Sequence, residues 1–92
     1  SNTASTVVGA ATIQQVVGYQ LGQTVQFNAP LLMSESVGDV VIQIENAKGL
    51  GIDLKQLGLD DGVLMQMGLS FEVISIEALE GKMVYTLKPL LN

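Results

Sequence analysis

Short apolar runs rich in β-branched residues, most of them bounded by glycine, are the feature that most constrains how this chain can fold. The clearest run spans residues 40–45 and alternates so that Val40, Ile42 and Ile44 share one face. Such alternation is typical of a half-buried strand. Gly38 and Asp39, which come immediately before it, are typical of a tight turn. The pattern therefore favours a mainly β fold.

Other runs predict further elements. Residues 71–78 and 82–87 are expected to pair as a hairpin around Gly81, and residues 24–28 and 63–69 predict two more strands. Residues 12–21 fit both a helical face and an alternating strand, and their β-branched content and internal glycines favour the strand. Turns are expected at Gly22, Gly38, Asp39, Asp60, Asp61, Gly62 and Gly81.

Two helical turns are also expected. Pro30 suits the first position of a turn over residues 31–33, because its missing N–H is not needed there. Asp53 suits the N-cap of a turn over residues 54–57, which Gly58 would end. Together the elements predict a small, mainly β domain, either barrel-like or intertwined, with about five or six short strands and one or two helical turns.

The domain is expected to cover residues 12–92. Residues 1–11 are mostly small and polar, so they are expected to form a flexible tail or linker. On that interpretation the substitution Gly9→Val should change almost nothing.

The size and apolar content of the chain favour self-association. A chain of 92 residues is near the size at which folding hides only about 60–65% of the surface of the unfolded chain. Yet 48% of the residues are apolar, which is generous for so small a domain. A homodimer would provide the missing burial. We expect its interface on the strand 40–44 or the hairpin, at Val40, Ile42, Ile44, Phe71, Ile74, Ile76 and Tyr85.

The residue types present exclude several classes of function. The chain has no His, no Cys and no Arg, so it lacks most nucleophile–base pairs and oxyanion-stabilising cations. We therefore expect no enzyme activity, no cofactor and no metal site, and Asp60 with Asp61 is expected to form a turn. The net charge of −5 would repel the phosphates of a nucleic acid. No apolar run approaches the roughly 20 residues of a membrane helix, so membrane insertion is not expected.

Several motifs occur in an order that resembles the SPOA domain (surface presentation of antigens) of flagellar motor switch and type III secretion ring proteins. The motifs are Leu21-Gly22-Gln23-Thr24, then Leu31-Leu32, then Gly38-Asp39-Val40-Val41, and last Ile52-Asp53-Leu54 before Gly58. Gln23 stands where that family usually has Arg, and the second half matches less well. The resemblance implies a cytoplasmic structural module that dimerises through exchanged strands and docks export or signalling proteins in a ring.

Two alternatives remain open from the sequence. One is an extracytoplasmic assembly or adhesion domain, periplasmic or at the cell surface, tethered through its uncharged N-terminal segment. The other is a small barrel that holds an apolar ligand among Met33, Met65, Met67 and Phe71. Methionines in alternation are more often part of a packed core than of a ligand site.

Overall fold

The structure is a computed structural model that describes residues 1–35 and 38–91. Within these residues the chain forms two sheets, a five-stranded sheet in the order β1-β4-β8-β7-β2 and a three-stranded sheet in the order β3-β6-β5. Among the strand pairs of the described residues, only β4 and β8 are parallel. The elements are β1 (Val7–Ala11), α1 (Ile13–Val16), β2 (Thr24–Gln26), β3 (Leu31–Met33), β4 (Val40–Ile44), β5 (Ile52–Asp53), η1 (Leu54–Leu57), β6 (Val63–Met65), β7 (Ser70–Leu79) and β8 (Lys82–Pro89).

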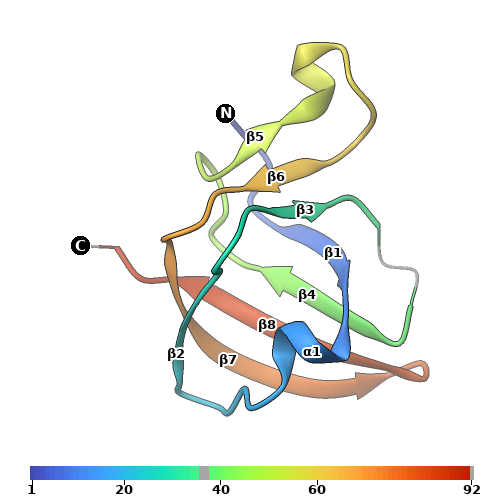
Figure 1. Cartoon of the computed structure of the whole chain (residues 1–92), viewed down its shortest axis with the longest axis vertical. Coiled ribbons are helices and arrows are strands. Elements are labelled where there is room, and N and C mark those ends of the chain that lie inside the picture. Colours follow the sequence, from blue (N-terminus) through green and yellow to red (C-terminus); the bar gives the residue numbers. More distant parts are fainter. Residues whose placement is uncertain (36–37, 92) are drawn as a thin grey trace.

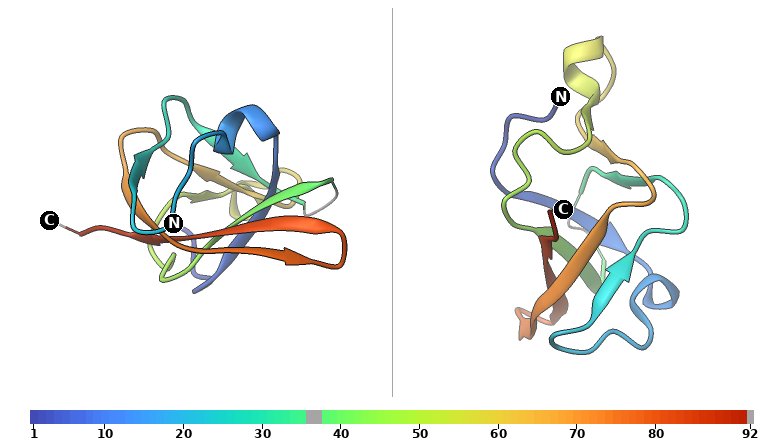
Figure 2. Two further views of the ribbon diagram at one scale, coloured as in Figure 1. Left: turned by 90° about the horizontal axis from the view of Figure 1, so that it is seen from below. Right: turned by 90° about the vertical axis from the view of Figure 1, so that its left-hand side faces the viewer.

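The five-stranded sheet curls into a half-barrel, and its concave side holds the core (Figures 1 and 2). The three-stranded sheet lies above it in Figure 1, and η1 projects from the upper end. The largest fully buried side chains come from both sheets: Phe71, Met33, Ile42, Ile44, Met65, Leu87 and Val73. The expectation of a mainly β fold with a barrel-like shape is thereby confirmed.

The strand at residues 40–44 and the predicted hairpin are both present. β4 lies between β1 and β8, and β7 pairs with β8 in antiparallel register from Phe71 opposite Pro89 to Leu79 opposite Lys82. A bulge interrupts the register between Val73 and Ser75. The hairpin turns at Glu80 and Gly81, whose φ values of 50° and 80° are both positive, as a two-residue hairpin turn of type I′ requires.

The expected tail over residues 1–11 is wrong, because residues 7–11 form β1, an integral strand of the large sheet. β1 pairs with β4, and Val7 lies in the core. The segment before it is also held in place, since the side chain of Asn2 donates a hydrogen bond to the Ala47 carbonyl at 2.9 Å. Gly9 on β1 must be small for the two sheets to pack, because a Cβ at this position would lie only 2.8 Å from Cα of Met33 on β3.

Two other assignments are also wrong. Residues 13–16 form the helical turn α1, since the side-chain oxygen of Thr12 accepts the Gln15 N–H at 3.2 Å while Gln15 Oε1 accepts the Thr12 N–H at 2.7 Å. This reciprocal pair is a capping box. Residues 31–33 form a strand, β3, because they pair with residues 63–65 of β6. Pairing between distant segments outweighs the local preference of Pro30.

The helical turn after Asp53 is confirmed as the 3-10 turn η1. The Asp53 carboxylate accepts the Lys55 N–H at 3.1 Å, and Gly58 ends the turn with a φ of 78°. The strand expected over residues 63–69 is shorter, since β6 ends at Met65. With β1, β3 and β5 added, the described residues contain eight strands, more than the sequence predicted.

Candidate interaction surface

The described residues hold little that resembles catalytic machinery. No three of their Asp or Glu side chains converge as a metal site would require. Asp60 and Asp61 lie in the loop between η1 and β6, where Asp61 forms an exposed ion pair with Lys55 at 3.5 Å. Within residues 1–35 and 38–91, no helix is long and apolar enough to cross a membrane.

The predicted partner-binding residues divide into two groups. Val40, Ile42, Ile44 and Phe71 are 5%, 1%, 0% and 0% exposed, so in the folded chain these side chains pack in its own core. Moreover, both edges of β4 are already paired, with β1 and with β8. An interface built on the face or the edge of β4 is thus not available to a folded chain.

The second group lies on the hairpin. Ile74, Ile76 and Tyr85 are half-buried, and Ile76 is opposite Tyr85 in the register of β7 and β8. The Tyr85 ring meets the Tyr19 ring edge to face, with centroids 5.9 Å apart. Ile76 and Tyr85 pack against the core cluster and so hold the hairpin against the rest of the molecule.

The predicted turn residues occupy loops of the kind expected. Gly22, Gly38, Gly62 and Gly81 have φ values of 81°, 139°, 151° and 80°. Asp39 contributes through its backbone, because its carbonyl accepts the Met83 N–H at 2.9 Å and so joins the start of β4 to β8.

The surface that the sequence did not reveal is the outer edge of β7. β2 pairs only with residues 70–72 of this ten-residue strand. Backbone hydrogen bonds from Gly22 and to Gln23 extend the contact to Val73 and no further. Among the described residues, no strand pairs with the outer edge of residues 75–79. Figure 1 shows β2 beside the first part of β7 only, with the rest of the hairpin projecting beyond it.

The distal part of β7 has the character of a strand that can accept a partner. Residues 75–79 pair in unbroken register with residues 82–86 of β8, so the bulge lies outside this segment. Leu79 is 52% exposed at its end, and Met83 is exposed opposite Ala78. Natural proteins usually protect open edges with charged side chains, prolines or bulges. Residues 75–79 contain one charge, Glu77, and no Lys or Pro, and the bulge lies just before them.

The apolar-ligand site expected from the sequence is divided between the core and the surface. The four residues expected to hold an apolar ligand do not line a cavity together, since Met33, Met65 and Phe71 are buried in the core while Met67 is exposed. A cavity of about 240 Å³ does open beside α1, lined by different residues.

No protein-family model matches the chain, and a search of curated proteins finds no match either.

Proposed function

We propose that this domain is a non-enzymatic assembly module that forms a homodimer through the outer edge of β7 and docks with other proteins in a larger complex. The observation that carries the proposal is the unpaired edge of residues 75–79, which ends in the exposed Leu79. An unpaired strand edge offers a row of N–H and C=O groups that a second strand can bind.

Symmetry specifies how two copies would meet. A twofold axis makes the two β7 strands antiparallel, and pairing centred on the five-residue segment places the two Glu77 side chains opposite each other. Like charges in opposed positions weaken strand pairing by a fraction of a kcal/mol to about 1 kcal/mol. The interface is also short. We therefore expect a reversible dimer with a dissociation constant of roughly micromolar order or weaker.

The resemblance to SPOA domains supports the same class of function. That family dimerises and builds cytoplasmic rings of flagellar motors and type III secretion systems, so we propose a cytoplasmic, ring-associated role here. The extracytoplasmic alternative relied on a free N-terminal tether. Because residues 7–11 form β1, this argument for the alternative no longer applies.

Light scattering coupled to size-exclusion chromatography tests the proposal. The wild-type chain should change from monomer to dimer mass as its concentration rises to about 1 mM, well above a micromolar dissociation constant. Leu79→Glu should weaken the dimer, because it places a second carboxylate at the edge. Glu77→Gln should strengthen it, because it removes the opposed charges.

Leu57→Glu is the matched control. Leu57 is 64% exposed, but it lies on η1, at the opposite end of the molecule from the hairpin turn (Figure 1). This variant should dimerise like the wild type. A chain that stays monomeric at the highest concentration, or a dimer that is equally sensitive to Leu57→Glu and Leu79→Glu, would rule out the β7 interface.

A further inference from the structure

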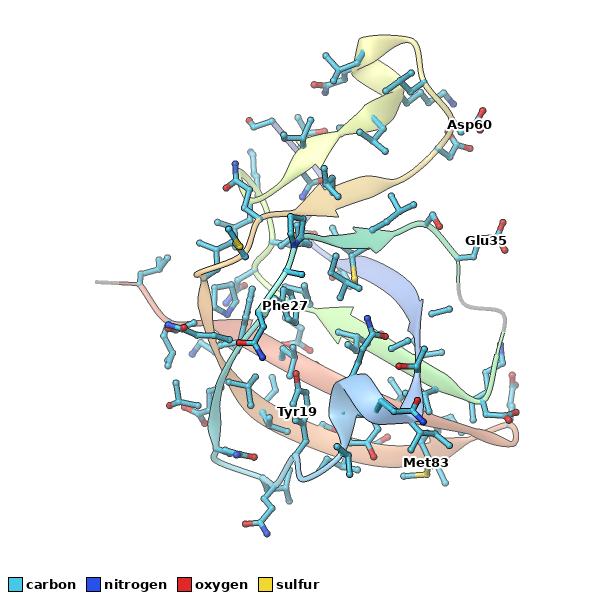
Figure 3. All side chains as sticks on the ribbon, viewed as in Figure 1. Tyr19, Phe27, Glu35, Asp60 and Met83 are labelled. Atoms are coloured by element: carbon cyan, nitrogen blue, oxygen red, sulfur yellow. The ribbon has the colours of Figure 1, made fainter. Side chains whose placement is uncertain are left out.

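A cavity of about 240 Å³ opens between α1 and the segment that connects β2 to β3. Its polar lining consists of Gln14 and Gln15 on α1, Tyr19 in the following loop, Gln26 on β2 and Asn28 just after β2. Figure 3 shows Tyr19 and Phe27 on this side of the molecule, with α1 beside them. Four amide side chains and one hydroxyl therefore surround a single small space.

Most of the hydrogen-bonding capacity of these groups is unused by the protein. Within the described residues, the side chains of Gln14, Asn28 and Tyr19 form no hydrogen bond to another residue. Gln15 uses its Oε1 to accept the Thr12 N–H, so its Nε2 is still able to donate. Gln26 uses its Nε2 to donate to Ser70 Oγ, so its Oε1 is still able to accept. The polar side chains that line the space thus keep both donors and acceptors available.

The floor of the cavity is apolar and firmly held. Phe27 is 8% exposed and its ring packs on Phe71 with centroids 5.0 Å apart. Ile42 from β4 is buried, and Ala29, Pro30 and Leu31 complete the apolar part of the lining. A ligand would therefore meet apolar side chains as well as polar groups, a combination common in small-molecule sites.

The lining carries no charge, and this follows from an asymmetry in the sequence. All nine acidic and four basic residues follow Ser34, so residues 1–34 are uncharged. Apart from Ile42, every residue that lines the cavity belongs to this segment. A charged ligand would find no opposite charge here and would lose hydration without compensation.

We propose that this cavity is a binding site for a single neutral, polyhydroxylated ring, such as a neutral hexopyranose. Each hydroxyl of such a ring both donates and accepts, as each amide side chain does. The less polar face of the ring can lie against Ala29 and Pro30, the exposed apolar residues of the lining. The cavity is smaller than the roughly 300–1,000 Å³ of sites for drug-sized ligands, which favours one ring over an oligosaccharide. This site is independent of the β7 edge.

Burial raises the pKa of the Tyr19 hydroxyl above its usual value of 10.0. A tyrosine hydroxyl is protonated at neutral pH even without such a shift, so Tyr19 can donate a hydrogen bond to a ligand oxygen. Its ring is fixed by the edge-to-face contact with Tyr85. Tyr19 thus offers a donor in a defined position.

NMR titration of the ¹⁵N-labelled chain tests this site. The probes are glucose, galactose, mannose and N-acetylglucosamine, with their methyl glycosides as a separate arm that represents a sugar unit within a glycan. We expect saturable shifts of the side-chain amide signals of Gln14, Gln15, Gln26 and Asn28 with at least one probe. Glucuronate and glucosamine, which carry a charge, should bind at least about tenfold more weakly because the lining offers no counter-charge.

Gln14→Ala and Asn28→Ala should each weaken binding roughly fivefold, the factor expected for one lost hydrogen bond. Both side chains are exposed, so the melting temperature should not change. Gln56→Ala, on η1 and outside the cavity, is the control and should bind like the wild type. The absence of saturable shifts with every neutral probe at about 100 mM would overturn the proposal. Shifts confined to other residues, or equal binding of glucuronate, would overturn it too.

Discussion

Gly9 shows how a single residue determines the distance between the two sheets. Its missing side chain lets β1 cross β3 so closely that a Cβ would lie 2.8 Å from Met33 Cα and 3.0 Å from Met33 Sδ. Backbone atoms cannot move aside as a flexible side chain can. Gly9→Val should therefore lower the free energy of unfolding by about 1–3 kcal/mol, or by more if the strand is displaced.

Urea denaturation measures this effect, and two variants put it in context. Gly38→Val should also cost about 1–3 kcal/mol, but through its φ of 139°, since the space around Gly38 is open. Thr3→Val lies at an exposed position in the same N-terminal segment and should leave stability unchanged. If Gly9→Val were as harmless as Thr3→Val, the close crossing of β1 and β3 would be incorrect.

Tyr19 makes stability depend on alkaline pH. Desolvation raises its pKa in the folded chain, whereas in the unfolded chain the pKa stays near 10.0. The folded state thus holds this proton more tightly, so its contribution is fully present below pH 10 and is lost as pH rises through the folded-state pKa. The free energy of unfolding, measured at several pH values on both sides of pH 10, should fall less steeply with rising pH for Tyr19→Phe than for the wild type. Identical slopes would contradict the burial of this hydroxyl.

At the scale of elements, the turn of the β7–β8 hairpin can be improved. Glu80 has a φ of 50°, a conformation that costs a non-glycine residue about 1–2 kcal/mol and that Asn tolerates best. Glu80→Asn should therefore stabilise the chain by up to about 1 kcal/mol. Asn46 provides the reciprocal test, because its φ of 51° is nearly the same. Asn46→Glu should lower the melting temperature, whereas Glu80→Asn should raise it. Melting temperatures that shift in the same direction for both variants would contradict the turn geometry.

The elements that the sequence predicted correctly are those defined by local signals. The hairpin combines two alternating runs with a turn glycine, and η1 has a capping Asp53 and a closing Gly58. The capping box of α1 is also a local signal, since Thr12 and Gln15 have the required spacing, but the β-branched residues and glycines around it favour a strand.

The elements that were missed depend on contacts between distant segments. Residues 7–11 have the small side chains of a linker, and only the tight crossing with Met33 explains why a strand needs them. Residues 31–33 and 52–53 are too short to show a period, and they form strands because both pair with β6. No local pattern encodes such pairing.

At the scale of the whole molecule, the uncharged first third of the chain contains β1, α1, β2 and β3, and every cavity-lining residue except Ile42 comes from it. The charged residues lie in the remainder. The sequence placed the expected interface on the strand 40–44 or the hairpin, and it could not show that β2 pairs with only the first part of β7. The length of a pairing is a property of the assembled sheet.

Amide hydrogen exchange of residues 75–79, measured at low and high protein concentration, tests the central claim most directly. In a single strand pair the N–H groups of an edge strand point alternately toward its neighbour and toward solvent. The outward-pointing amides of this segment should exchange quickly in the dilute chain. When nine chains in ten are dimeric they should exchange about tenfold more slowly, because only the dissociated chain exposes them. Exchange rates in residues 75–79 that do not depend on concentration, under conditions where light scattering shows a dimer, would contradict assembly through the edge of β7.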